Sequence, residues 1–166
     1  MPRLSPIAFS LALLTLSGGA LADLKIGVIA SSTGPTAVVG IPQKNTVALL
    51  PGEIAGHRVE YVVLDDASDP TNAVTGVKKL LAEHKVDALV GPTTTPAALA
   101  ILDFVAESRT PLVTTVGSSA VVQPMDDKKR WVFKTTQNDD LIAEAVLAHM
   151  TAAGIKTLGF IGFNDP

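Results

Sequence analysis

The chain has 166 residues, and its 13 Lys and Arg stand against 16 Asp and Glu, which gives a formal net charge of −3. This weak acidic balance is spread along the chain and forms no basic stripe, which argues against nucleic acid as a partner. The absence of cysteine excludes disulfides and thiolate metal sites. We expect neither a metal nor a cofactor.

Residues 1–22 have the pattern of a secretory signal peptide. Arg3 precedes an apolar stretch over residues 7–16, and Ala20-Leu21-Ala22 forms a small-x-small cleavage site. The stretch is too short to span a bilayer, and the alternative is a buried N-terminal helix. We therefore expect an exported protein that begins at Asp23 and has about 144 residues, the size of one ordinary domain.

From residue 24 onward, short apolar runs alternate with helical patterns. Residues 24–30 and 58–65 are rich in β-branched side chains and predict two buried strands. Residues 70–84 follow as a helix, with Asp69 as its cap and Pro70 just inside. Within it, Ala73 and Val77 belong to one apolar face.

The next strand, 86–91, opens onto a helix over residues 97–108. Thr95 is the predicted cap, and Pro96 is predicted to occupy the first helical position. Such a loop presents free N–H groups, hydroxyls and the positive end of a helix dipole, which suit a small anion. An ordinary capped turn is the alternative.

A fourth strand is predicted over residues 111–116, and a helix over 141–150 follows the cap candidates Asn138, Asp139 and Asp140. After Gly154, residues 157–163 predict a last strand. The alternation predicts an α/β fold, a doubly wound and mostly parallel sheet with helices on both faces. Ligands bind such sheets beyond the carboxyl ends of the strands. Three hydroxyl- and glycine-rich loops fall there, 31–35, 91–95 and 117–119, although Ser and Thr are also ordinary loop residues.

Five segments in order closely resemble the amino-terminal lobe of periplasmic leucine/isoleucine/valine-type binding proteins, the solute-binding components of ABC importers. They read K-I-G-V-I-A-S-S-T-G-P, V-V-L-D-D-A-S-D-P-T-N-A, L-V-G-P-T-T-T-P, P-L-V-T-T-V-G-S-S-A and W-V-F-K-T-T-Q-N-D. The resemblance implies a type I periplasmic binding protein lobe over residues 23–166. It also implies a periplasmic location, an amino acid or small carboxylate as ligand, and an inner-membrane ABC permease as partner.

The resemblance also implies the site residues. Thr95 matches the hydroxyl residue that holds the ligand carboxylate. Gly117 matches a residue whose carbonyl accepts a hydrogen bond from the ligand ammonium. Ser119 matches a hydroxyl residue that contacts the same head group. Asp139 lies near the family's cleft, although an N-cap role would also explain it.

Several positions depart from the family pattern. Val39 stands where an aromatic residue often lines the site, and Ser68 and Thr94 stand where relatives can carry a disulfide. The segment 40–56 is shorter than in leucine-type members, which implies a truncated first helix interrupted at Pro51-Gly52. Family members continue into a second lobe, so residues 23–166 alone are expected to bind ligand at millimolar affinity or weaker, about −4 kcal/mol, and to expose apolar surface.

Enzymatic activity is not expected, because no nucleophile elbow, phosphate loop or dinucleotide fingerprint is present. Asp65 and Asp66 could form a pair of catalytic acids, but a turn that precedes a capped helix is the favoured interpretation of these two residues. The alternative function is a ligand-sensing domain of a receptor or regulator with the same fold.

Overall fold

The computed structural model of the chain describes residues 23–162. Six strands form one sheet in the order β2-β3-β1-β4-β5-β6. Their bounds are β1 Leu24–Ala30, β2 Glu53–Ile54, β3 His57–Asp65, β4 Ala88–Val90, β5 Leu112–Thr114 and β6 Val132–Lys134. All neighbouring pairs are parallel except β2 with β3, which are antiparallel. The predicted doubly wound, mostly parallel sheet is confirmed.

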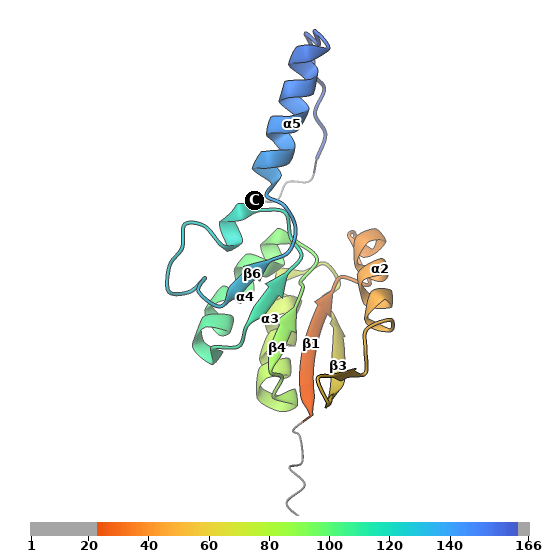
Figure 1. The fold of residues 1–166 in the computed structure, drawn as a ribbon, viewed down its shortest axis with the longest axis vertical. Helices are drawn as coiled ribbons and strands as arrows, with labels where there is room; N and C mark the ends of the chain where they lie inside the picture. Colours follow the sequence, from red (N-terminus) through yellow and green to blue (C-terminus); the bar gives the residue numbers. More distant parts are fainter. Residues whose placement is uncertain (1–22, 163–166) are drawn as a thin grey trace, which may run out of the picture.

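Helices α3 (Pro70–Lys79) and α4 (Thr95–Ser108) cover one face of this sheet (Figure 1). The main core lies between them and the strands, where Val77, Leu80, Ile101 and Leu112 are almost completely buried. Helix α2 (Ala37–Val47) lies beside β1 on the opposite face. In the described part of the chain, it covers less of that face than α3 and α4 cover of theirs.

The predicted start of α3 is confirmed. The Asp69 carboxylate accepts hydrogen bonds from the N–H groups of Thr71 at 2.7 Å and Asn72 at 3.0 Å, as an N-cap does. The helical path then continues through a π-helical turn, Leu80–His84, and ends at Lys85, whose φ is 52°. The predicted extent of 70–84 is therefore correct, while the change of helical type was not predicted.

The predicted cap of α4 is wrong by one residue. Thr94 has the extended backbone of an N-cap (φ −113°, ψ 148°), and Thr95 is already the first helical residue. Pro96 therefore occupies the second helical position, where its missing N–H still leaves no helical hydrogen bond unmade. No side-chain cap bond is made at Thr94, so the first turn keeps its N–H groups free for another acceptor.

Helix α5 (Asp139–Ala152) projects away from the sheet, and none of its residues is buried (Figure 1). The predicted strand over residues 157–163 is wrong over its described part, since 157–162 form no regular structure. Phe160 and Ile161 are 91% and 97% exposed. A strand needs a neighbour for its backbone hydrogen bonds, and this segment has none among the described residues.

Membrane-spanning length is not reached by any helix in the described range. The predicted signal peptide, residues 1–22, lies outside that range.

Candidate ligand-binding edge

The carboxyl ends of the parallel strands bring four loops to one edge of the sheet. These loops follow β1, β3, β4 and β5, and they include all three of the hydroxyl-rich segments predicted to meet there. Their contacts show how the edge is held together.

A chain of hydrogen bonds joins the loops after β1 and β4 to the end of β5. The Ser31 N–H donates to Thr93 Oγ1 at 2.9 Å, and that hydroxyl donates to Gln43 Oε1 at 2.6 Å. Gln43 Nε2 donates to Thr115 Oγ1 at 3.3 Å, and Thr115 Oγ1 donates to the Pro92 carbonyl at 3.1 Å. Three segments distant in sequence are thereby fixed relative to one another through one amide side chain of α2.

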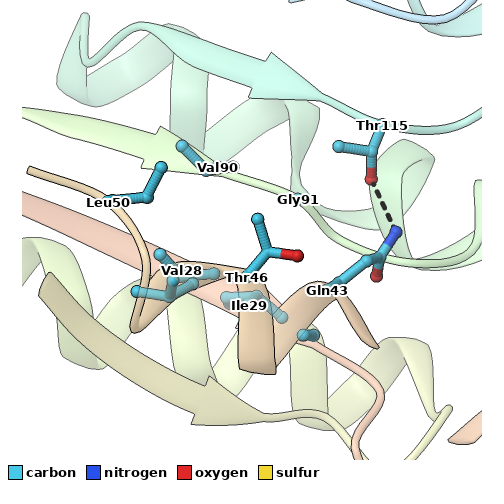
Figure 2. A pocket seen from close by; sticks show the side chains of 10 residues that line it. Val28, Ile29, Gln43, Thr46, Leu50, Val90, Gly91 and Thr115 are labelled. Carbon is cyan, nitrogen blue, oxygen red and sulfur yellow. Dashed lines mark hydrogen bonds between the residues drawn. The ribbon is translucent and has the colours of Figure 1, made fainter. Parts of the chain in front are cut away.

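Gln43 was not identified from the sequence. Its signal was weak, because a polar residue within the mostly apolar run 37–50 also fits a solvated helix face. Only the approach of α2 to the sheet gives the amide its two hydroxyl partners, Thr93 and Thr115. Figure 2 shows the bond between Gln43 and Thr115.

The loop after β1 is held by the Asp65 carboxylate. Asp65 accepts from the N–H groups of Ser32 at 2.9 Å, Thr33 at 3.2 Å and Ala67 at 2.9 Å, and from the Thr33 hydroxyl at 2.7 Å. Burial alone would raise the pKa of Asp65, but these hydrogen bonds to the ionised form outweigh it and lower the pKa below its usual value.

Asp66 is buried, with 1% of its surface exposed. Its Oδ1 accepts from the Ser31 hydroxyl at 2.6 Å and from the Ser68 N–H at 2.9 Å, while Oδ2 has no hydrogen-bond partner within the described part of the chain. The two neighbouring acids therefore accept hydrogen bonds that stabilise the turn before α3. This is the interpretation that the sequence favoured over a catalytic pair.

Thr95 lies half-buried in the first turn of α4. No hydrogen bond to its hydroxyl is found among residues 23–162, so this group is free for a ligand. Ala98, one turn further on, packs against Val116 and Val121. This contact places the start of α4 beside the loop 117–119.

Gly117, Ser119 and Asp139 are brought together at that loop. The Asp139 N–H donates to the Gly117 carbonyl at 3.2 Å, and the Asp139 carboxylate lies against the Gly117 Cα. Ser119 Oγ donates to Asp140 Oδ2 at 3.3 Å. Asp140, considered from the sequence only as a helix cap, is thus the partner of a predicted site residue.

The cap explanation for Asp139 is wrong, because Asn138 occupies the cap position and makes no side-chain cap bond. Asp139 and Asp140 are the first two residues of α5, where their charge complements the positive end of the helix. Their carboxylates also give this side of the edge a negative charge.

A pocket of about 270 Å³ lies under α2, next to this edge (Figure 2). Apolar side chains of β1, β4 and α2 line most of it, and Gln43 and Thr115 stand at one side. None of the predicted site residues lines it. The pocket therefore meets the edge at Gln43, Gly91 and Thr115, and not at the predicted site residues.

Comparison with known proteins places the chain in a family. The family model described as "Periplasmic binding protein" matches residues 23–166. The Leu/Ile/Val-binding protein homolog 3 of Brucella melitensis is 29% identical over 155 residues, which cover 89% of this chain and 42% of that protein.

Two solved structures extend the comparison. An extracellular ligand-binding receptor from Rhodopseudomonas palustris HaA2 is 47% identical with a TM-score of 0.84, over 86% of this chain and 40% of that one. An ABC transporter solute-binding protein from the same strain, in complex with p-hydroxybenzoic acid, is 27% identical with a TM-score of 0.68, over 80% of this chain and 36% of that one.

The chain spans about two fifths of the length of these relatives. The names of the Brucella protein and of the p-hydroxybenzoic acid complex describe binding proteins. The matched model covers the whole described structure, and the chain belongs to the periplasmic binding protein family.

Proposed function

We propose that this chain supplies the first lobe of an extracytoplasmic solute-binding protein that serves an ABC importer. Residues 1–22 act as its signal peptide, and residues 23–166 belong to the lobe, with α5 as the segment through which the chain leaves the sheet. The ligand is held in the cleft between this lobe and a second one, and an inner-membrane permease receives it.

One observation carries the binding proposal: the Thr95 hydroxyl, which has no hydrogen-bond partner among residues 23–162, lies in the first turn of α4, next to the loop of Gly117 and Ser119. The first N–H groups of a helix and the positive end of its dipole attract a carboxylate. A hydroxyl in the same turn adds a further hydrogen bond. Thr95 is thus proposed to hold the ligand carboxylate.

The second half of the proposal concerns an ammonium group. The Gly117 carbonyl and the Asp139 carboxylate lie together, and Asp140 is bonded to Ser119. Carbonyl and carboxylate oxygens accept hydrogen bonds from an ammonium group. This pairing favours an amino acid, in line with the name of the Brucella relative, while the p-hydroxybenzoic acid complex supports the carboxylate alone.

Titration calorimetry on a full-length protein containing this chain tests both halves. We use leucine, its deaminated analogue 4-methylpentanoate, and p-hydroxybenzoate. The expected result is that leucine binds more tightly than 4-methylpentanoate. Binding of p-hydroxybenzoate without leucine would contradict the ammonium half only, and binding of none of the three would contradict the carboxylate site.

A further inference from the structure

A polar hollow of about 420 Å³ lies at the end of the sheet opposite the candidate ligand-binding edge. Its lining comes from the end of α4, shortly before β5, and from the loop that leads into β6. The lining residues are Ala106, Arg109, Asp127, Arg130 and Trp131. Because β5 and β6 are parallel, the segments that precede them share one edge of the sheet. The proposed cleft lies at the other edge, where the strands end.

The loop that forms one wall of the polar hollow is fixed in place by its lysines. Lys128 Nζ pairs with Asp103 Oδ1 of α4 at 2.7 Å. Lys129 Nζ donates to the carbonyls of Gln123 at 2.9 Å and Pro124 at 3.2 Å. The positive charges of both lysines are thus used within the fold, and the wall is held against α4.

The two arginines of the polar hollow differ from these lysines. The guanidinium groups of Arg109 and Arg130 make no ion pair and no side-chain hydrogen bond within residues 23–162. Asp127 lines the same hollow, so two arginines against one aspartate give the lining a formal charge of +1, although the whole chain carries −3. This local charge favours a ligand with one negative charge.

Trp131 adds a flat apolar wall to the polar hollow. Its side chain is half-buried and packs against the main core, and its carbonyl accepts from the Leu112 N–H at 2.9 Å. The indole ring is therefore held at the start of β6. Such a ring packs against another aromatic ring in an offset-stacked or edge-to-face arrangement. The planar guanidinium groups nearby are suited to bind a carboxylate through two parallel hydrogen bonds.

We propose that the polar hollow binds a small aromatic carboxylate, whose carboxylate accepts hydrogen bonds from Arg109 and Arg130 while its ring packs against Trp131. The volume of about 420 Å³ lies within the range of small-molecule sites, roughly 300–1,000 Å³. Asp127 repels a second negative charge, so a monocarboxylate is favoured over a dicarboxylate. The proposal is independent of the proposed function, because none of these residues belongs to the ligand-binding edge.

Fluorine NMR of the full-length protein labelled with 5-fluorotryptophan tests the proposal, because Trp131 is the sole tryptophan of residues 1–166. Its signal is assigned by its disappearance in Trp131→Phe, or in Trp131→Tyr if the first variant fails to fold. Benzoate is the probe. Benzamide lacks the charge and cyclohexanecarboxylate lacks the aromatic ring, so these two compounds are the matched controls. We expect benzoate to shift the Trp131 signal to saturation and each control to bind about fivefold more weakly or worse.

Variants of the two arginines separate the polar hollow from other sites. Arg109→Gln and Arg130→Gln should each weaken benzoate binding about tenfold, as when a charged group loses its hydrogen-bond partner. Lys79→Gln, on the exposed side of α3, removes the same charge outside the hollow and is the control. It should leave the dissociation constant of benzoate nearly unchanged.

A Trp131 signal that does not shift, or that shifts without saturation, would overturn the proposal. Equal binding of benzoate and benzamide, or benzoate binding that survives in both arginine variants, would also overturn it. Benzoate binding that is lost in Thr95→Ala and kept in both arginine variants would place this ligand at the candidate ligand-binding edge. That outcome would remove the polar hollow as a site and leave the proposed function standing.

Discussion

The Asp139 carboxylate occupies the space in which a side chain at position 117 would begin. A Cβ built on Gly117 would overlap both carboxylate oxygens, and the Asp139 N–H donates to the Gly117 carbonyl at 3.2 Å. This close approach joins the end of the β5 loop to the first turn of α5. Glycine at position 117 is therefore required by space.

Gly117→Ala should weaken ligand binding in the full-length protein, because the added methyl group displaces Asp139 from the edge. We expect a loss of tenfold or more in affinity, about 1.4 kcal/mol, measured by calorimetry. Gly52→Ala is the matched control, since its Cβ would meet nothing within 4 Å. If overlap with Asp139 is the cause, adding Asp139→Ala to Gly117→Ala should restore the folding stability lost in the single variant, and an unchanged loss would contradict this explanation.

Thr95→Ala and Ser119→Ala should each reduce ligand affinity in the full-length protein by about 1–3 kcal/mol, the usual result when a charged group loses a hydrogen bond. Ser118→Ala is the control. The Ser118 hydroxyl accepts from the Ala120 N–H at 3.3 Å and so supports the local turn rather than the proposed ligand. Unchanged affinity in both site variants would contradict the assignment.

Asp65→Asn should lower the free energy of unfolding at neutral pH, because the ionised carboxylate accepts four hydrogen bonds from the neighbouring loops. The pKa of Asp65 is lowered in the folded state, where burial opposes these bonds but does not outweigh them. Its contribution to stability is therefore present above the unfolded pKa, about 3.9, and is lost as the pH falls through the folded value.

Urea unfolding at pH 7 and at pH 3 measures this effect. The difference between the variant and the unmodified protein should be larger at pH 7. Asp127→Asn, at an exposed position, is the control. A difference that is the same at both pH values would show that the Asp65 charge does not hold the loop.

Gly40→Ala should destabilise the protein, although alanine is the better helix former by about 1 kcal/mol. Gly40 is buried in α2, and a Cβ there would overlap the backbone of Ser31 at the end of β1. Gly76→Ala in α3 is the matched control, since its Cβ would meet side-chain atoms only, the flexible Ile29 Cδ1 at 3.2 Å and Leu64 at 3.7 Å. Thermal unfolding should show a lower midpoint for Gly40→Ala and an unchanged or higher one for Gly76→Ala.

Export should remove residues 1–22, because the cleavage pattern Ala20-Leu21-Ala22 follows the apolar stretch of the leader. The intact mass of the secreted protein should then correspond to a chain that begins at Asp23. Secreted material that still carries Met1, or a cut several residues away, would contradict the prediction.

Local patterns in the sequence determined much of the fold. Strand β1 and the helix that begins after Asp69 were predicted because their signals, apolar periodicity and a cap followed by proline, lie within a few residues of one another. The position of the hydroxyl loops at one edge also followed, since the carboxyl ends of parallel strands share an edge. The resemblance to a known family named Thr95, Gly117, Ser119 and Asp139.

Only the tertiary structure decided the features that depend on distant partners. Gln43 became a link between loops because α2 lies across the sheet, and Asp140 became the partner of Ser119 because β6 delivers α5 to the same edge. Residues 157–162 have the apolar composition of a strand but form none, because a strand exists only where a neighbour accepts its hydrogen bonds. Composition and spacing report what a segment can form, and the partner that makes it form is a property of the folded molecule.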